Sequence, residues 1–204
     1  MRFIETHDQL RDLYGPVYES AVKKELPRLE AHSRNFIARS PFLLIGSQDG
    51  NGRGDVTPKG DKPGFVQVLD DQTIAIPDRP GNKRLDTFEN IIRNPGVGLI
   101  FFIPGMDETL RIDGEARLTD DEELRRRCAA EGRPALAVLV VKIRSHYMHC
   151  AKAFMRSQLW KPETWRPRSE MPTLGQIVRD QQDLAITSES IDEGLAEAYR
   201  KSLW

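Results

Sequence analysis

The tetrapeptide Asp49-Gly50-Asn51-Gly52 constrains the fold of this chain more than any other stretch. Glycine and asparagine tolerate the positive φ angles that tight turns require, so this segment indicates a β-hairpin. It closely follows an apolar run at residues 42–46, which is typical of a buried strand. Because a hairpin reverses the chain direction, the segment favours an antiparallel β-sheet over the parallel sheet of a βαβ protein.

Further strand candidates continue this pattern. In residues 109–118, apolar or small side chains alternate with charged ones, as in a strand with one solvated face. The segment Asp70-Asp71-Gln72 is short enough to close a second hairpin. The remaining strand candidates are residues 65–69, 73–77, 97–103 and 135–144.

Helical periodicity surrounds and interrupts these strands. Residues 1–40 carry short apolar stripes, and Pro27 is expected to open a helix at its first turn. Residues 84–93 form a helix that ends at Asn94-Pro95-Gly96. Further helices are predicted at residues 120–130, 147–159 and 174–182, and from about residue 187 to the end. Residues 161–172, with three prolines, are read as a loop.

Strands with helices between and after them, without βαβ alternation, predict a mainly β chain of the α+β class. We expect a small antiparallel barrel in one domain, residues 1–204. Its parts would be N-terminal helices at 1–40, a barrel core at 41–146 and a helical C-terminal segment at 147–204.

Composition narrows the possible functions. The net charge of -1 gives no overall field that would favour nucleic acid or acidic membranes. The longest apolar run, residues 135–141, is far short of the roughly 20 residues that span a bilayer. Cys128 and Cys150 lack the spacing of zinc ligands, and the charged residues 1–10 do not resemble a signal peptide. These features predict a cytoplasmic protein that binds neither nucleic acid nor membranes.

A first candidate site is the segment Asp55-Val56-Thr57-Pro58-Lys59-Gly60-Asp61, which lies between two strand candidates. The lysine ammonium and the threonine hydroxyl could hold a phosphate through charge-assisted hydrogen bonds. The alternative is a solvated hairpin connection rich in turn-forming residues.

A second candidate site is Pro77-Asp78-Arg79-Pro80-Gly81-Asn82-Lys83-Arg84, directly before the predicted helix at 84–93. A helix N-terminus attracts anions and normally disfavours cations. Lys83 and Arg84 in a first helical turn therefore suggest that a bound anion compensates them. The alternative is a basic surface loop.

A third candidate lies in the predicted helix at 147–159. Lys152, Arg156 and Trp160 are spaced at i, i+4 and i+8, with His149 one turn earlier, a row that suits an anionic aromatic ligand. The alternative is a half-buried helix with solvated cations. His146, His149 and Cys150 have no evident fourth ligand, so no metal site is predicted. The chain also lacks the G-x-S-x-G pattern of a hydrolase nucleophile.

The candidate segments occur in an order that resembles the pyridoxamine 5′-phosphate oxidase-like family, in particular a bacterial branch of FMN-binding proteins. The resemblance runs from about Ser40 to Trp160 and depends on the combination of segments. It is carried by SPFLLIGSQDGNGRGDVTPKGDKPGFVQVLDD, TIAIPDRPGNKRLDTFENIIRNPGVGLIFFIPGMDETLRIDGEARL and HCAKAFMRSQLW.

The resemblance implies an antiparallel split β-barrel that dimerises with two FMN molecules at the interface. Gly81-Asn82-Lys83-Arg84 would grip the phosphate, and Asp55–Lys59 would line the phosphate and the flavin ring. In the stretch Glu108–Arg111, Thr109 is the nearest match to a glutamine that reaches the flavin in the oxidases, and Arg111 lies beside it. Lys152, Arg156 and Trp160 would reach the partner subunit's flavin.

The resemblance has one departure. The C-terminal segment with which the oxidases recognise pyridoxal phosphate has no convincing match, which leaves the flavin site without the vitamin B6 site. The sequence therefore predicts a homodimeric FMN-dependent oxidoreductase that acts on a small molecule. The alternative is a non-catalytic split barrel that holds a flavin, a deazaflavin or a haem.

Overall fold

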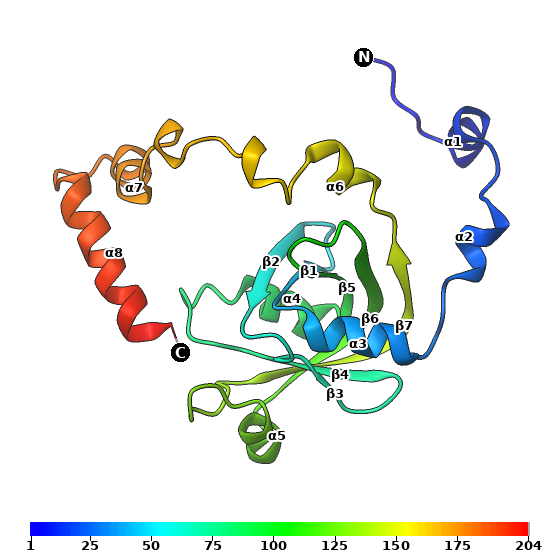
Figure 1. Cartoon of the computed structure of the whole chain (residues 1–204), viewed down its shortest axis with the longest axis horizontal. Helices are drawn as coiled ribbons and strands as arrows, with labels where there is room; N and C mark the ends of the chain where they lie inside the picture. The colour runs from blue at the N-terminus through cyan, green and yellow to red at the C-terminus, as the bar shows by residue number, and fades with distance from the viewer. Residues whose placement is uncertain (204) are drawn as a thin grey trace.

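A computed structural model describes residues 1–203 and contains one seven-stranded antiparallel sheet (Figure 1). The strand order is β2-β1-β5-β6-β7-β4-β3, and every neighbouring pair is antiparallel. This arrangement confirms the predicted α+β class and antiparallel sheet. The strands are β1 (Phe42–Gln48), β2 (Gly54–Gly60), β3 (Gln67–Val68), β4 (Thr73–Pro77), β5 (Gly96–Phe102), β6 (Thr109–Thr119) and β7 (Val138–His149).

The first hairpin forms where the sequence predicts it. Ser47 pairs with Asp55 across β1 and β2, and the turn between the strands places Gly50 and Gly52 at positive φ. The Asp49 carboxylate accepts the backbone N–H groups of Asn51 and Arg53. The bond from Asn51 is the main reason that the pKa of Asp49 is lowered. Local turn chemistry therefore fixes this hairpin.

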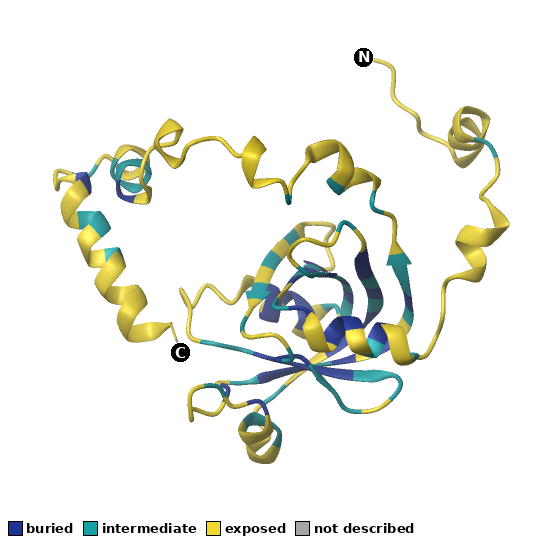
Figure 2. Cartoon of the chain, in the orientation of Figure 1, coloured by how far each residue is buried: buried dark blue, intermediate teal, exposed yellow. Residues whose placement is uncertain are grey.

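The core lies on the inner face of the curved sheet. Leu43, Ile45, Leu99, Phe101 and Ile112 are fully buried there, and helices α3 (Ala31–Arg39) and α4 (Asp86–Arg93) add further apolar side chains (Figure 2). Helix α5 (Glu122–Arg127) lies between β6 and β7 in the chain. Because adjacent residues of a strand point to opposite faces, the same strands also present an outer face.

The outer face differs from one half of the sheet to the other. On β6 it carries charged residues such as Arg111, Glu115 and Arg117. On β2, β1 and β5 the register aligns a row of mostly apolar residues with two glycines, none of them charged and none fully buried. They are Val56, Pro58, Phe42, Leu44, Gly46, Gly98, Ile100 and Phe102. Pro58 fits this place because β2 is an edge strand, where a missing backbone N–H is tolerated.

The prediction that Pro27 opens a helix is wrong. The backbone N–H and C=O groups of Leu26 bond to those of His146 in β7, at 2.9 Å each, so this stretch is extended. The buried His146 ring also contacts the Arg28 carbonyl (2.9 Å) and the Ser33 hydroxyl (3.2 Å). Helix α3 begins instead at Ala31, after Glu30 caps it.

Three further element predictions need correction. Residues 55–59 are part of strand β2, not a connection between strands. The strand predicted at 65–69 shortens to Gln67–Val68. The helix predicted at 147–159 is also wrong at its start, since β7 continues to His149, where it pairs with Thr109. Helix α6 then covers only Lys152–Ser157.

Two arms leave the barrel at the ends of the chain (Figure 1). The N-terminal arm holds α1 (His7–Tyr14) and α2 (Glu19–Lys23). The C-terminal arm, residues 152–203, begins with α6 and continues with two short 3₁₀ turns (Pro162–Thr164 and Arg168–Glu170), α7 (Leu174–Gln182) and α8 (Ser188–Ser202). Most of both arms is exposed in Figure 2, with partly buried residues where α7 and α8 meet. No helix within residues 1–203 has the length and apolar character needed to cross a bilayer.

We expect Gly114→Ala to destabilise the sheet by about 1–3 kcal/mol, the usual range for overpacking. The register of β6 against β7 shifts at Asp113/Gly114, and a Cβ on Gly114 would lie 2.4 Å from the Lys142 carbonyl oxygen. Gly96→Ala is the matched control, because its Cβ would meet only the Asn94 side chain, at 3.5 Å. Urea denaturation should separate the two variants; equal stabilities would contradict the prediction.

Candidate cofactor site

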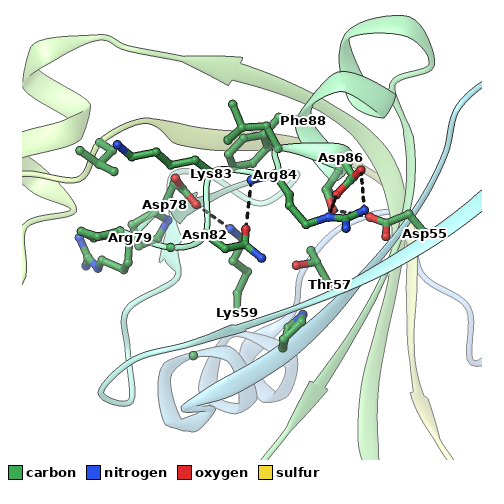
Figure 3. Close-up of a pocket in the computed structure, with 18 of the residues that line it drawn as sticks. Asp55, Thr57, Lys59, Asp78, Arg79, Asn82, Lys83, Arg84, Asp86 and Phe88 are labelled. Carbon is green, nitrogen blue, oxygen red and sulfur yellow. Dashed lines mark hydrogen bonds and ion pairs between the residues drawn. The ribbon is translucent and has the colours of Figure 1, made fainter. Parts of the chain in front are cut away.

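A cavity of about 540 Å³ lies between β2 and the loop that joins β4 to α4 (Figure 3). Small-molecule sites in proteins are usually about 300–1,000 Å³. The inner-face residues of β2 form one wall, because they pair with the core residues of β1. The main lining side chains are Asp55, Thr57 and Lys59 of β2, Asp78, Arg79, Asn82, Lys83 and Arg84 of the loop, Thr87 and Phe88 of α4, and Phe65, Leu85 and Leu136.

Two ion pairs cross the gap between β2 and the loop. The Lys59 ammonium lies 2.6 Å from the Asp78 carboxylate, and Arg79 Nε lies 2.9 Å from the carboxylate of Asp61, just after β2. The side chains of Lys59 and Asp78 are 20% and 15% exposed. Those of Arg79 and Asp61 are 16% and 4% exposed. Lys59 also lies 4.9 Å from the centre of the Phe88 ring. These pairs hold the two walls together and neutralise Lys59 and Arg79.

The start of α4 is fixed to the first hairpin. The Thr87 hydroxyl donates to the Asp55 carboxylate at 2.6 Å, and the buried Asn90 amide donates to the Ser47 hydroxyl at 3.2 Å. These two bonds join α4 to β2 and β1. The far end of the cavity is therefore a rigid corner.

Lys83 and Arg84 precede α4 rather than occupying its first turn, so this part of the prediction is wrong. The helix begins at Asp86, after Leu85, and Arg84 pairs with the Asp86 carboxylate at 2.8 Å. Their hydrogen bond raises the pKa of Arg84 and lowers that of Asp86. The helix N-terminus thus already carries a compensating acid, as its dipole favours.

The loop backbone before α4 is strained. Lys83 and Leu85 both adopt positive φ angles, 60° and 62°, which non-glycine residues rarely do. The Asn82 side-chain amide oxygen (Oδ1) accepts a hydrogen bond of 3.1 Å from the Arg84 backbone N–H, which lies between Lys83 and Leu85. Such strain persists only where the surroundings enforce it, and it concentrates at binding sites.

Two polar side chains of the cavity, among the residues that the structure describes, have no polar partner. Within residues 1–203, the Lys83 ammonium and the Thr57 hydroxyl make no hydrogen bond or ion pair. Figure 3 shows Arg84 pointing toward Asp86 and Asp55, whereas the Lys83 side chain extends toward the Asp78 and Arg79 end. The cavity therefore offers an anion one free ammonium, one free hydroxyl and one guanidinium that a single carboxylate holds.

The structure gathers some of the predicted residues and separates others. Those predicted in the two loop segments all line this cavity: Asp55, Val56, Thr57, Pro58, Lys59, Asn82, Lys83 and Arg84. Thr109 is buried at the start of β6, and Arg111 faces outward beside Asp113 and Tyr147. Neither of these two residues lines the cavity.

Lys152, Arg156 and Trp160 also lie away from the cavity. Lys152 and Arg156 share a face of α6, as predicted, but the prediction that Trp160 continues this row is wrong, because α6 ends at Ser157 and Gln158 adopts a φ of 53°. Trp160 instead stacks on Phe154 and donates its indole N–H to the Met106 carbonyl at 2.7 Å.

Sequence reasoning missed the ion pairs that hold the walls together. The two candidate segments contained all four residues of these pairs. However, Lys59 and Asp78 are 19 positions apart in the chain, and Asp61 and Arg79 are 18 positions apart. The available signal was the opposite charge pattern of Lys59-Gly60-Asp61 and Asp78-Arg79. Thr87 and Leu136 gave no comparable signal.

A smaller cavity of about 280 Å³ lies beyond Arg79 and is lined by Cys128. Burial raises the pKa of the Cys128 thiol despite the nearby Arg79 and Arg127. A thiol held in its neutral form is a poor nucleophile. Among residues 1–203, no three His, Cys, Asp or Glu residues are grouped to hold a metal.

Comparison with known proteins identifies a family. The sequence model of the pyridoxamine 5′-phosphate oxidase family matches residues 29–150, more than half of the chain. The match spans the sheet and the 540 Å³ cavity and leaves out most of both arms. None of the curated proteins compared with the chain matches it.

Several solved structures are similar in fold. HupZ from Group A Streptococcus aligns with a TM-score of 0.49 at 14% identity, covering 59% of this chain and 93% of its own. A candidate pyridoxamine 5′-phosphate oxidase from Lactobacillus delbrueckii aligns with a TM-score of 0.47 at 22% identity, and the alignment covers 61% of this chain and 98% of that protein. An FMN-binding protein from Syntrophomonas wolfei aligns with a TM-score of 0.45 at 12% identity, and the alignment covers 70% of this chain and 96% of that protein.

Proposed function

Because the chain belongs to the pyridoxamine 5′-phosphate oxidase family, we propose that it binds FMN in the 540 Å³ cavity and works as an FMN-dependent oxidoreductase. The observation that carries this proposal is the unpaired Lys83 ammonium at the strained loop. Lys59, Arg79 and Arg84 each have a carboxylate partner, but Lys83 has none within residues 1–203. A phosphate dianion is a suitable partner for it.

The residues present fit such a cofactor. Lys83, Arg84 and the Thr57 hydroxyl would hold the phosphate, with Arg84 shared between the ligand and Asp86. Phe65, Leu85 and Leu136 supply apolar surface for an aromatic ring. When bound, FMN supplies the electron or hydride transfer, while the protein binds and orients it. Both cysteines are free, which fits the proposed cytoplasmic location.

The proposal includes a homodimer. The outer face of β2, β1 and β5 is mostly apolar and carries no charge, and its members Phe42 and Val56 are exposed. Contiguous apolar patches of this kind usually mark an interface. An uncharged patch can meet its own copy across a two-fold axis without repulsion between like charges. Sedimentation should give twice the monomer mass; a stable monomer would contradict this part.

The second candidate is a non-catalytic protein that holds a flavin, a deazaflavin or a haem. Among the described residues that line the cavity there is no His, Cys, Met or Tyr, so a haem there would lack the usual axial ligands. This favours a flavin or a deazaflavin over a haem. Adding a reduced nicotinamide cofactor separates catalysis from simple binding, because bleaching of the flavin absorbance requires electron transfer.

We expect FMN to bind at least about tenfold more tightly than riboflavin, because one charge-assisted bond to the phosphate is worth more than 1.4 kcal/mol. The two ligands share the ring and differ in the phosphate, so riboflavin is the matched control. Quenching of flavin fluorescence during titration measures both affinities. Equal affinities would show that the cavity has no phosphate site.

A further inference from the structure

The C-terminal arm carries apolar side chains that nothing within residues 1–203 covers. Between residues 161 and 203 only Gly175 and Ser188 are buried, and neither has a large side chain. Figure 1 shows α7 and α8 held away from the barrel at the end of the arm. The exposed apolar residues of this arm are Met155, Leu159, Trp165, Met171, Leu174, Ile186, Tyr199 and Leu203.

The end of this arm is nevertheless a specifically built hairpin of two helices. The Gly175 N–H donates to the Asp192 carboxylate at 2.7 Å, and a Cβ at Gly175 would lie 2.4 Å from the Ser188 carbonyl oxygen. Thr173 and Gln176 form a capping box at the start of α7. Helices of 9 and 15 residues without a core are marginal in water, so this hairpin needs a partner surface.

The charges along the arm are segregated. Residues 152–172, the proximal half, hold five Lys and Arg and two Glu, a net charge of +3. Residues 173–203, the distal half, hold three Lys and Arg and six Asp and Glu, a net charge of −3. The ion pairs within the arm, such as Arg179–Asp180 and Lys201–Glu197, join residues of the same half and leave both net charges unchanged.

We infer that the C-terminal arms of two copies of this chain pair in opposite directions, with the acidic distal half of each lying against the basic proximal half of the other. In a two-fold interface, a contact from one copy to its partner is repeated from the partner to the first copy. An arm with halves of opposite charge is therefore complementary to its own copy. The same pairing would cover the exposed apolar residues of both halves.

This pairing extends the proposed homodimer and does not depend on flavin binding. The family match ends at residue 150, so the arm is a feature of this chain outside the matched region. The pairing also gives Lys152 and Arg156 acidic partners, which neither has within residues 1–203. The other possible occupants are the chain's own barrel and a different protein.

The test uses two charge reversals in the full chain. One variant carries Lys161→Glu and Arg166→Glu, which makes both halves acidic; the other carries Glu189→Lys and Glu193→Lys, which makes the distal half basic. Each alone should raise the hydrogen-exchange rates of α7 and α8 amides about tenfold or more, since lost pairing frees the hairpin. A one-to-one mixture should restore the wild-type rates, because the hybrid pair has opposite charges at both contacts.

The controls separate this inference from the proposed function. Reversal of Arg117 and Lys142 to Glu on the β6–β7 outer face should leave exchange in α7 and α8 unchanged. A mixture that exchanges as fast as its components would overturn the pairing, since an arm that folds onto its own chain gains nothing from mixing. Wild-type protection in either variant would also overturn it. Sedimentation and FMN titration of the wild type report separately on the homodimer and the flavin site.

Discussion

Replacing Lys83 by alanine is expected to weaken FMN binding about ten- to a hundredfold. The Lys83 ammonium has no partner within residues 1–203, so a bound phosphate would supply its only charge-assisted bond in the cavity. Such bonds contribute about 1.5–3 kcal/mol, and 1.4 kcal/mol corresponds to a factor of ten. The empty protein should keep its stability, because alanine leaves the positive φ at this position as strained as before.

Arg84→Ala should weaken FMN binding less than Lys83→Ala, although still by about tenfold, since Arg84 must share its guanidinium with Asp86. Lys142→Ala, an exposed lysine on β7, is the matched control and should bind FMN normally. Flavin fluorescence gives the affinities, and thermal melts of the empty proteins give the stabilities. Wild-type affinity in both variants would mean that the phosphate lies elsewhere.

Asp61→Ala is expected to destabilise the protein by about 3 kcal/mol, at the lower end for breaking a buried ion pair. The Asp61 side chain is 4% exposed, and its removal leaves the Arg79 guanidinium, 16% exposed, without its carboxylate. An uncompensated charge in that position is costly because water cannot replace the lost partner. The gap between β2 and the loop after β4 should open, and the FMN site should weaken with it.

The matched control for Asp61→Ala is Asp71→Ala, which breaks the pair of Arg28 and Asp71. These side chains are 61% and 45% exposed, and exposed pairs contribute at most about 1 kcal/mol. Adding Arg79→Met to Asp61→Ala should recover much of the lost stability, because no charge then remains unpaired. Equal losses from Asp61→Ala and Asp71→Ala in urea denaturation would contradict the assignment of a buried pair.

Local chemistry explains which parts of the fold the sequence predicts. The turn at Asp49 is fixed by bonds within five residues, and helix α7 begins after a capping box that Thr173 and Gln176 form. The cluster of cations at Lys83 and Arg84 pointed to a loop that lines the 540 Å³ cavity. The sequence placed the first residue of α4 too early. The helix begins at Asp86 because Leu85 adopts a positive φ and so cannot be part of it.

Long-range contacts explain the failures. Residues 147–149 are strand because Thr109 and Leu110 pair with His149 and Met148, and this pairing overrides their helical periodicity. Pro27 lies in an extended stretch because Leu26 bonds to His146, more than a hundred residues away in the chain. Likewise, the pairing of Lys59 with Asp78 depends on the closing of the sheet, which no spacing along the chain reveals.

Strand β2 has a consequence for how this protein can diversify. The alternation of a strand directs the side chains of its odd-numbered residues, Asp55, Thr57 and Lys59, toward the cavity. Val56 and Pro58 border the cavity, but their side chains belong to the outer row. Ligand preference and subunit association can therefore be tuned by separate substitutions within a single heptapeptide. Insertion or deletion of one residue there would exchange the two sets at once. Directed evolution of this strand should thus tolerate point changes at Val56 and Thr57, which make no side-chain ion pair, and reject changes in the length of the strand.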